Sequence, residues 1–323
     1  MIMRRFFVLM SMLMSSVMLF AQSVEREVAV ECDWGKISAT LATPADGSDT
    51  AIVIVAGSGP TDRNGNSQLN LNTYSYKLLS DGLVGEGYAV LRYDKRAIGR
   101  SPIAAEDVAN LVLDDFVDDA VTCVEYLRSE GYKRIFIAGH SEGGLIALIV
   151  ASRGVRVDGL VLLAAPGYPM DTILRTQLSA QLMPQYAGLM LQADMALRKL
   201  KAGQRIANED IAKELLSLFH SSVQPFLISS MQYDPQLLAS GVEYPMLVVC
   251  GGNDIQVSRD NGEVIAKSAP NAKFVVFESM THVLKDWASS DRMEQVVSVY
   301  VNSQLPLTEG LVSEISQFIK TIK

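Results

Sequence analysis

The chain has 323 residues, of which 49% are hydrophobic and 20% charged, and its formal net charge is −8. This length suffices for one large domain with a well-buried core, or for two small ones, and the composition excludes collagen-like, coiled-coil and disordered chains. The acidic balance and the lack of lysine or arginine runs argue against nucleic acid as a partner.

Residues 1–21 predict a secretory signal peptide. Arg4 and Arg5 precede the apolar stretch VLMSMLMSSVMLF, and the small residues of AQS follow it. This order is typical of a signal that is cleaved, here after Ala21. The stretch is shorter than the roughly 20 residues that span a bilayer and carries serines, so we expect no stable membrane insertion after cleavage. The protein is therefore expected to be exported, either periplasmic or secreted.

The elements that follow alternate between strands and helices. VEREVAVEC and KISATLATP alternate apolar and polar residues around DWG, which predicts an antiparallel hairpin. A continuous apolar run, typical of a strand covered on both faces, occurs at 51–57, and further strands are predicted at 88–94, 134–140, 159–166, 244–252 and 272–279. Helical spacing occurs between them, at 74–87, 106–129 (as one long helix), 145–150 and 257–269, and again near the C-terminus.

This alternation predicts an α/β fold with a mostly parallel, doubly wound sheet and an N-terminal antiparallel hairpin. Residues 167–240 interrupt the alternation with apolar residues at helical spacing, and predict two to four amphipathic helices and no strand. Asn208, which acidic residues follow, predicts a helix start within this segment. The core then consists of residues 22–166 and 241–323.

The sequence GHSEGG, residues 139–144, stands between the strand at 134–140 and a helix. It matches the G-x-S-x-G nucleophile elbow, in which a serine sits on a sharp strand-to-helix turn. Side chains larger than glycine at positions 139 and 143 would collide with this turn. A phosphate-binding loop is excluded because no Lys and Ser/Thr follow the second glycine. Ser141 is therefore the predicted nucleophile.

A serine hydroxyl needs a base, and the chain has three histidines. His140 is the neighbour of Ser141, and adjacent residues of a strand point to opposite faces, so it is disfavoured. His220 lies in the helical segment. His282 follows the last predicted strand, at the carboxyl edge of the sheet, and is the predicted base.

The base needs an acid to hold its tautomer. Asp254 directly follows the strand at 244–252, whereas Asp260 falls inside the following helix and is the weaker candidate. The resulting order, Ser141, Asp254, His282, is that of α/β-type hydrolases.

The three cysteines, Cys32, Cys123 and Cys250, lie far apart in segments that predict strands or a helix. Their spacing fits neither a disulfide framework nor a zinc site, so we interpret them as small buried hydrophobic residues.

With these motifs, the chain from about residue 24 to its end resembles the α/β-hydrolase superfamily. The loops GSGPTDRNGN (57–66) and YDKRAIGRS (93–101) resemble those of a bacterial subgroup of exported esterases and serine aminopeptidase-like proteins. The resemblance implies that residues 167–240 form a helical cap. It also implies that the backbone N–H groups of Ser58 and Glu142 form the oxyanion hole. Ala97 stands where the subgroup usually has the first glycine of D-x-R-G-x-G, so this turn is expected to differ.

Within these two loops, Asp62, Arg63 and Asp94 are expected to order the loops among themselves. For Arg63, a direct role in substrate binding is the alternative to a structural salt bridge. The predicted function is a serine hydrolase that cleaves small-molecule carboxylic esters with short to medium acyl groups, and it requires no metal or organic cofactor.

The alternative enzyme is a serine aminopeptidase or proline iminopeptidase-like peptidase. It would need an acidic cluster in the cap to bind a free amino terminus. Glu209, Asp210 and Glu214 are present there, but their helical spacing indicates a solvated face. A non-catalytic binding protein is the alternative from another class, and the intact triad positions argue against it.

Overall fold

A computed structural model describes residues 23–182 and 186–322 of the chain. The predicted signal peptide, residues 1–21, lies outside the described residues. Among the residues that are described, no helix is both long and apolar enough to cross a membrane.

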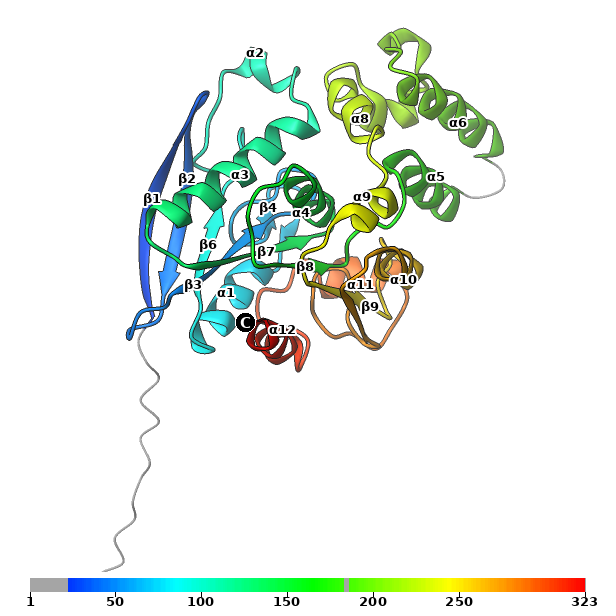
Figure 1. Cartoon of the computed structure of the whole chain (residues 1–323). Coiled ribbons are helices and arrows are strands. Elements are labelled where there is room, and N and C mark those ends of the chain that lie inside the picture. Colours follow the sequence, from blue (N-terminus) through cyan, green and yellow to red (C-terminus); the bar gives the residue numbers. More distant parts are fainter. Residues whose placement is uncertain (1–22, 183–185, 323) are drawn as a thin grey trace, which may run out of the picture.

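The centre of the molecule is an eight-stranded sheet in the order β1-β2-β6-β3-β7-β8-β9-β10 (Figure 1). The first two strands form the expected antiparallel hairpin, β2 also pairs antiparallel with β6, and all other pairs are parallel. The strands are β1 Val24–Cys32, β2 Gly35–Thr43, β3 Thr50–Val55, β6 Ala89–Tyr93, β7 Arg134–His140, β8 Gly159–Leu163, β9 Met246–Gly251 and β10 Ala272–Phe277. The predicted doubly wound, mostly parallel sheet is confirmed.

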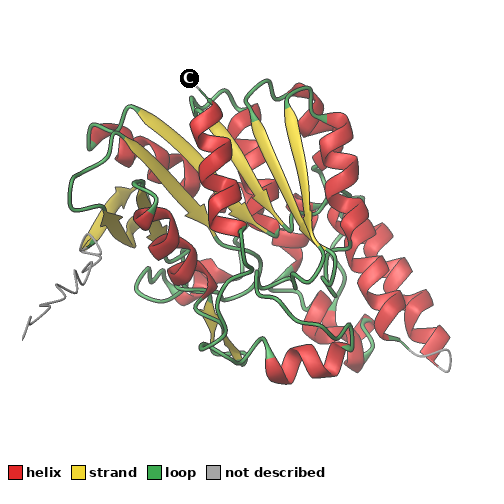
Figure 2. Ribbon diagram, turned by 90° about the horizontal axis from the view of Figure 1, so that it is seen from below, coloured by secondary structure: helices red, strands yellow, loops and turns green. Residues whose placement is uncertain are grey.

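Helices cover both faces of the sheet (Figure 2). One face carries α1 Ser75–Gly85 and α12 Leu311–Thr321, and the other carries α3 Leu113–Ser129, α4 Glu142–Ser152, α9 Pro235–Gly241 and α10 Arg259–Ser268. The apolar runs divide between the two layers with the period of a strand, because Ile52 packs in the core under α1 and α12 while Val53 packs in the core under α3 and α4. This double burial explains why the central strands, such as β3, β8 and β9, are almost entirely apolar.

The helix predicted over 106–129 is broken in two, α2 Ala105–Val108 and α3. The Asp115 carboxylate accepts a hydrogen bond from the Val112 N–H (2.8 Å), and Ser229 Oγ accepts one from the Leu113 N–H (2.7 Å). In a continuous helix these two N–H groups would donate to carbonyls of the preceding turn. Because side chains accept them instead, α3 begins at this point as a separate helix. Ser229 is more than one hundred residues away, which is why periodicity alone misses the break.

The described residues of 167–240 form helices, but more and shorter ones than expected. They are α5 Met170–Gln181, α6 Ala187–Lys201, α7 Leu216–Phe219, α8 Gln224–Ser230 and α9, with single 3₁₀ turns at Asn208–Asp210 and Lys213–Leu215. Pro225 and Pro235 stand in the first turns of α8 and α9, where proline's missing N–H costs no hydrogen bond. We call this segment the helical insertion.

The helical insertion has a hydrophobic core of its own, distinct from the two cores of the sheet. Its buried members include Ala193, Leu197, Leu200, Phe219, Leu227 and Met231. In Figure 1, α5, α6 and α8 stand to one side of the sheet, and α9 lies closer to it. Two further features were not predicted: the small hairpin of β4 Asn66–Ser67 and β5 Leu71–Asn72, and the short helix α11 Arg292–Ser298.

Candidate active site

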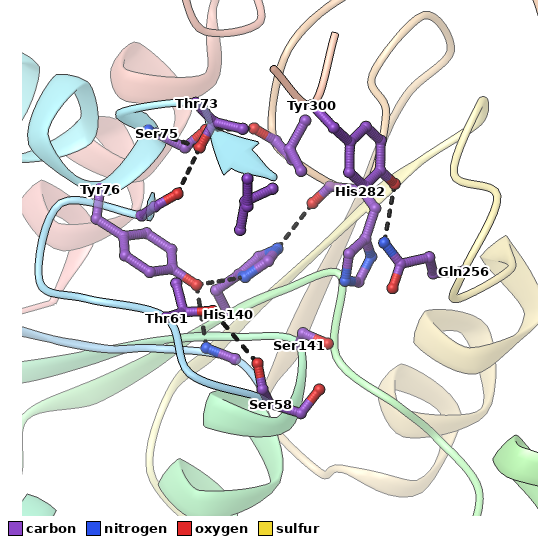
Figure 3. A pocket seen from close by; sticks show the side chains of 14 residues that line it. Ser58, Thr61, Thr73, Ser75, Tyr76, His140, Ser141, Gln256, His282 and Tyr300 are labelled. Atoms are coloured by element: carbon purple, nitrogen blue, oxygen red, sulfur yellow. Dashed lines mark hydrogen bonds between the residues drawn. The ribbon is translucent and has the colours of Figure 1, made fainter. Parts of the chain in front are cut away.

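Ser141 stands alone between strand β7 and helix α4, with φ 52° and ψ −123°. Positive φ is uncommon for a residue other than glycine and is strained, at a cost of about 1–3 kcal/mol. Its N–H donates to Leu163 O (2.8 Å), and its carbonyl accepts from the Gly144 N–H (2.8 Å). The turn is therefore held from both sides, and the side chain faces the pocket (Figure 3).

The glycines on either side of this serine are required by close backbone contacts. A Cβ on Gly139 would lie 2.2 Å from Gly143 O, and a Cβ on Gly143 would lie 2.2 Å from Val55 O. Neither neighbour can move aside easily, since both are backbone atoms. The collision expected from the sequence is thus present in the structure.

His282 and Asp254 meet at the same edge of the sheet, from the loops that follow β10 and β9. The distance from His282 Nδ1 to Asp254 Oδ2 is 2.8 Å, and the Asp254 side chain is fully buried. The second oxygen of Asp254 accepts the N–H groups of Gln256 (2.7 Å) and Val257 (2.9 Å). Because a carboxylate only accepts, Nδ1 of His282 carries the proton and Nε2 is left as an acceptor.

Backbone hydrogen bonds join the two loops that carry this pair. Gly252 N–H donates to Phe277 O (2.9 Å), and Asn253 N–H donates to Met280 O (3.1 Å). The spacing between acid and base is therefore set by the backbone rather than by the two side chains alone.

Ser141 and His282 line one pocket, together with residues of the loop after β3 (Figure 3). Within residues 23–182 and 186–322, no hydrogen bond joins the Ser141 hydroxyl to His282. Such catalytic bonds are commonly long in the absence of substrate and tighten when it binds. The structure thus brings together all three predicted side chains, with the acid–base contact formed.

The remaining candidates lie apart from this pocket. Asp260 is exposed and accepts a hydrogen bond from Ser258. His220 is exposed in the helical insertion, where its ring contacts Asn208 and Ser222. No described residue of the helical insertion lines the pocket, although Gln177 of α5 donates to Gln256 O (3.1 Å) at its rim.

The loop after β3 places Ser58 at the mouth of the pocket, next to the elbow. A Cβ on Gly57 would lie 3.1 Å from the Ser141 Cβ, a tight contact that glycine at this position avoids. Lys95 Nζ donates to Gly57 O (2.6 Å) and to Gly59 O (2.8 Å). Since a peptide unit is planar and trans, the Ser58 N–H points opposite to the Gly57 carbonyl, away from Lys95.

Glu142 contributes the other candidate donor, because it is the first residue of α4 and first-turn N–H groups have no partner within a helix. Its side chain is buried, and burial raises the pKa of its carboxyl, an effect that the charge of Lys95 opposes. Burial in turn lowers the pKa of Lys95. Lys95 was not singled out in the sequence, where it is one basic residue of the loop 93–101.

The loops 57–66 and 93–101 are joined as expected through Arg63 and Asp94. One oxygen of Asp94 accepts the Arg63 N–H (2.9 Å), and the other accepts the Arg63 guanidinium (2.8 Å). Asp62 accepts the N–H groups of Asn64 and Asn66, both at 2.8 Å. Ala97 has φ 69° and so adopts the left-handed conformation that a glycine would occupy without strain.

His140 also lines the pocket, contrary to the expectation that it would point to the opposite face from Ser141. Strict alternation fails because Ser141 has already left the strand, with its positive φ. The ring centroids of His140 and His282 are 4.9 Å apart. Burial lowers the pKa of His140 to about 3, so its ring is neutral at physiological pH.

The three cysteines lie outside the pocket. Cys123 and Cys250 are buried, as predicted, whereas Cys32 is only half-buried, and all three are free thiols. Burial raises the pKa of Cys250 to about 12, so its thiol is inert. In the described part of the chain, no cluster of three or more His, Cys, Asp or Glu is arranged to hold a metal ion.

Comparisons with known proteins identify similar chains. The family model described as serine aminopeptidase, S33, matches residues 70–285, a range that includes Ser141, Asp254 and His282. The esterase EstD of Thermotoga maritima is 27% identical over 265 residues, covering 80% of this chain. The chain spans 60% of the length of that relative.

Two solved structures show the same fold at low identity. An esterase of Pyrococcus furiosus superposes with a TM-score of 0.58 at 20% identity, covering 93% of this chain and 91% of its own. The proline iminopeptidase of Mycobacterium smegmatis superposes with a TM-score of 0.61 at 14% identity, covering 92% of this chain and 98% of its own. Esterases and a peptidase thus share this architecture.

Proposed function

The chain belongs to the serine aminopeptidase family S33, within the α/β-hydrolase superfamily, and on this premise we propose that it is a serine hydrolase of carboxylic esters with short acyl groups. The observation that carries the proposal is the Asp254–His282 hydrogen bond, which leaves Nε2 of His282 free to accept a proton at the pocket that Ser141 lines. A serine at an elbow, a base of fixed tautomer and an orienting carboxylate are the parts that acyl transfer needs.

In the proposed mechanism, Ser141 Oγ attacks the ester carbonyl carbon while His282 Nε2 takes the hydroxyl proton. Asp254 stabilises the imidazolium that forms. The carbonyl oxygen becomes an anion, which accepts hydrogen bonds from the N–H groups of Ser58 and Glu142. As the tetrahedral intermediate collapses, the C–O bond to the alcohol breaks and His282 returns the proton to that oxygen.

The acyl group is then bound to Ser141, and water releases it by the same steps. His282 takes a proton from the water as its oxygen attacks the acyl carbon, and gives a proton to Ser141 Oγ as that oxygen leaves.

The size and lining of the pocket support short, neutral substrates. Its volume is about 90 Å³, a compact space that suits an acyl group of a few carbon atoms. The lining is hydroxyl, imidazole, amide and apolar, and no acidic side chain of the described residues contributes to it.

The same lining disfavours the aminopeptidase alternative, which needs a carboxylate to bind a substrate ammonium group. Glu209, Asp210 and Glu214 are exposed on the helical insertion and do not line the pocket. The neutral pocket therefore favours an ester over a free amino terminus.

A substrate panel tests the proposal. Turnover of p-nitrophenyl acetate, butyrate and octanoate is compared with that of aminoacyl p-nitroanilides, for wild type, Ser141→Ala and Ser217→Ala. Ser217 is exposed on α7, far along the chain from the elbow, and provides a matched serine-to-alanine control. We expect acetate and butyrate to be the best substrates, and loss of at least about 10³-fold in kcat for Ser141→Ala only. Fast anilide turnover with negligible ester turnover would contradict the proposal.

We also propose that the mature protein is exported after cleavage behind Ala21. The proposal rests on the basic, apolar and small-residue order of residues 1–21. N-terminal sequencing of the protein from the native host should give Gln22 as the first residue, in the extracytoplasmic fraction. Protein that retains Met1 and stays in the cytoplasm would contradict export.

A further inference from the structure

We propose that His140 and Tyr76 are positioning residues that hold the base of the triad in place by fixing the backbone carbonyl of His282. The inference rests on the proposed function, since it assigns a role within that same site. It concerns two side chains that were not predicted to take part, and that line the pocket beside Ser141 and His282 (Figure 3).

The hydrogen bonds of His140 have only one consistent direction. Its Nε2 lies 2.7 Å from His282 O, and a carbonyl oxygen can only accept, so Nε2 carries the proton. In the neutral ring Nδ1 is then an acceptor, and it lies 2.8 Å from the Tyr76 hydroxyl. Tyr76 therefore donates to His140, and its oxygen accepts the Gly57 N–H at 3.0 Å.

This chain of bonds connects three loops that the mechanism uses. Gly57 belongs to the loop of the candidate oxyanion hole, His140 is the residue before Ser141, and His282 is the base. All the groups between them are buried. A shift of any one loop would therefore break a hydrogen bond between buried groups, and the loss of that bond costs free energy.

Helix α1 adds a second contact to the same loop. Ser75 Oγ donates to Val283 O at 2.6 Å, so two successive carbonyls, those of His282 and Val283, are held by His140 and by the first turn of α1. Because Ser75 and Tyr76 are adjacent, α1 supports the base both directly and through His140. The His282 backbone is thus fixed relative to the residue that is covalently joined to the nucleophile.

The neutrality of His140 suits this role. A charged ring with its centroid 4.9 Å from that of His282 would repel the imidazolium formed during catalysis. Burial and the pairing of both ring nitrogens keep His140 uncharged and keep its tautomer fixed. His140 therefore holds the base without competing for its proton.

Variants at His140 distinguish the hydrogen bond that its ring donates to His282 O from the simple filling of space by the side chain. In His140→Gln the side-chain amide nitrogen can reach the position of Nε2 and donate to His282 O. In His140→Asn the shorter amide reaches only the position of Nδ1, so the contact with Tyr76 is retained and the donor to His282 O is lost. Tyr76→Phe removes the hydroxyl alone. His220→Gln and His220→Asn, at an exposed histidine of the helical insertion, are the matched controls.

The measurements are kcat and KM for p-nitrophenyl acetate, and the downfield ¹H resonance of the His282 Nδ1–H, which requires no substrate. We expect His140→Asn to lower kcat about 10²-fold with KM nearly unchanged, His140→Gln to recover most of this loss, and Tyr76→Phe to lower kcat about tenfold. The resonance should shift or broaden in His140→Asn and return in His140→Gln.

Equal loss in His140→Gln and His140→Asn, or an unchanged resonance and kcat in His140→Asn, would overturn the proposal. A loss of kcat in proportion to the loss of thermal stability across all three variants would also overturn the proposal, since it would indicate that the residues have only a structural role. If wild-type protein hydrolyses no ester, the proposed function fails, and the resonance still tests whether His140 positions His282.

Discussion

Replacing Asp254 by asparagine should abolish most of the activity while leaving the protein folded. Asparagine has the same shape, and its Oδ1 can still accept the N–H groups of Gln256 and Val257. The other carboxylate oxygen, 2.8 Å from His282 Nδ1, becomes an amide NH₂. Two donors cannot face each other, so the His282 proton moves to Nε2, which can then no longer accept the Ser141 proton.

The magnitude follows from this change of tautomer. In the well-studied Ser-His-Asp proteases, the same substitution lowers kcat about 10⁴-fold, which corresponds to about 5–6 kcal/mol of transition-state stabilisation. The fold should lose much less, about 1–2 kcal/mol, because two of the three hydrogen bonds to residue 254 remain.

The assay is the initial rate of p-nitrophenyl acetate hydrolysis, combined with urea unfolding followed by circular dichroism. Asp260→Asn is the matched control, since Asp260 is exposed and lies six residues further along the same segment. We expect wild-type rates for Asp260→Asn and a loss of several orders of magnitude for Asp254→Asn. A folded Asp254→Asn protein with near-normal kcat would refute the reasoning and move the role of the acid elsewhere.

Three further predictions concern buried or strained residues near the site. Lys95→Met removes the donor to Gly57 O and Gly59 O. It should lower kcat for p-nitrophenyl acetate about tenfold or more, with little change in KM. An unchanged kcat would show that the loop after β3 keeps its shape without Lys95. Ala97→Gly relieves a positive φ of 69° and should raise the free energy of unfolding in urea by about 0.5–1 kcal/mol; a loss of stability would contradict the assigned strain. Lys285 is fully buried, and burial lowers its pKa to about 8 from 10.5, so the folded state binds fewer protons than the unfolded state between these values. Wild type should therefore gain stability as pH rises from about 8 to 10.5. The free energy of unfolding of Lys285→Met minus that of wild type should be largest below pH 8 and fall by up to about 3 kcal/mol across this range; a pH-independent difference would refute the assignment.

The order of elements was predictable because buried parallel strands have a simple signature. The run at 51–57 is apolar throughout, those at 134–140 and 244–252 are apolar in their interiors, and each contains a strand of the sheet. Ser141, Asp254 and His282 could be placed because each follows such a run, and the ends of parallel strands meet at one edge. For these strands, the apolar pattern of the sequence and the topology of the sheet lead to the same assignment.

The details that were missed depend on contacts between distant residues. The break before α3 requires Ser229, and the role of His140 requires Tyr76 and the carbonyl of His282. The bounds of the short helices in the helical insertion are set by prolines and tertiary packing more than by the periodicity of apolar residues. None of these contacts leaves a repeat in the sequence that a pattern of apolar residues could reveal.

The separate core of the helical insertion has a consequence for how such enzymes diversify. Its apolar side chains, such as Leu197, Leu200 and Phe219, are buried against one another and form a core separate from the two cores of the sheet, while α8 and α9 contact the helices that cover the sheet. Mutations there can reshape the approach to the pocket while the hydroxyl, the imidazole and the carboxylate keep their supports. A new substrate preference can therefore be acquired, by natural selection or by grafting, without rebuilding the chemistry beneath it.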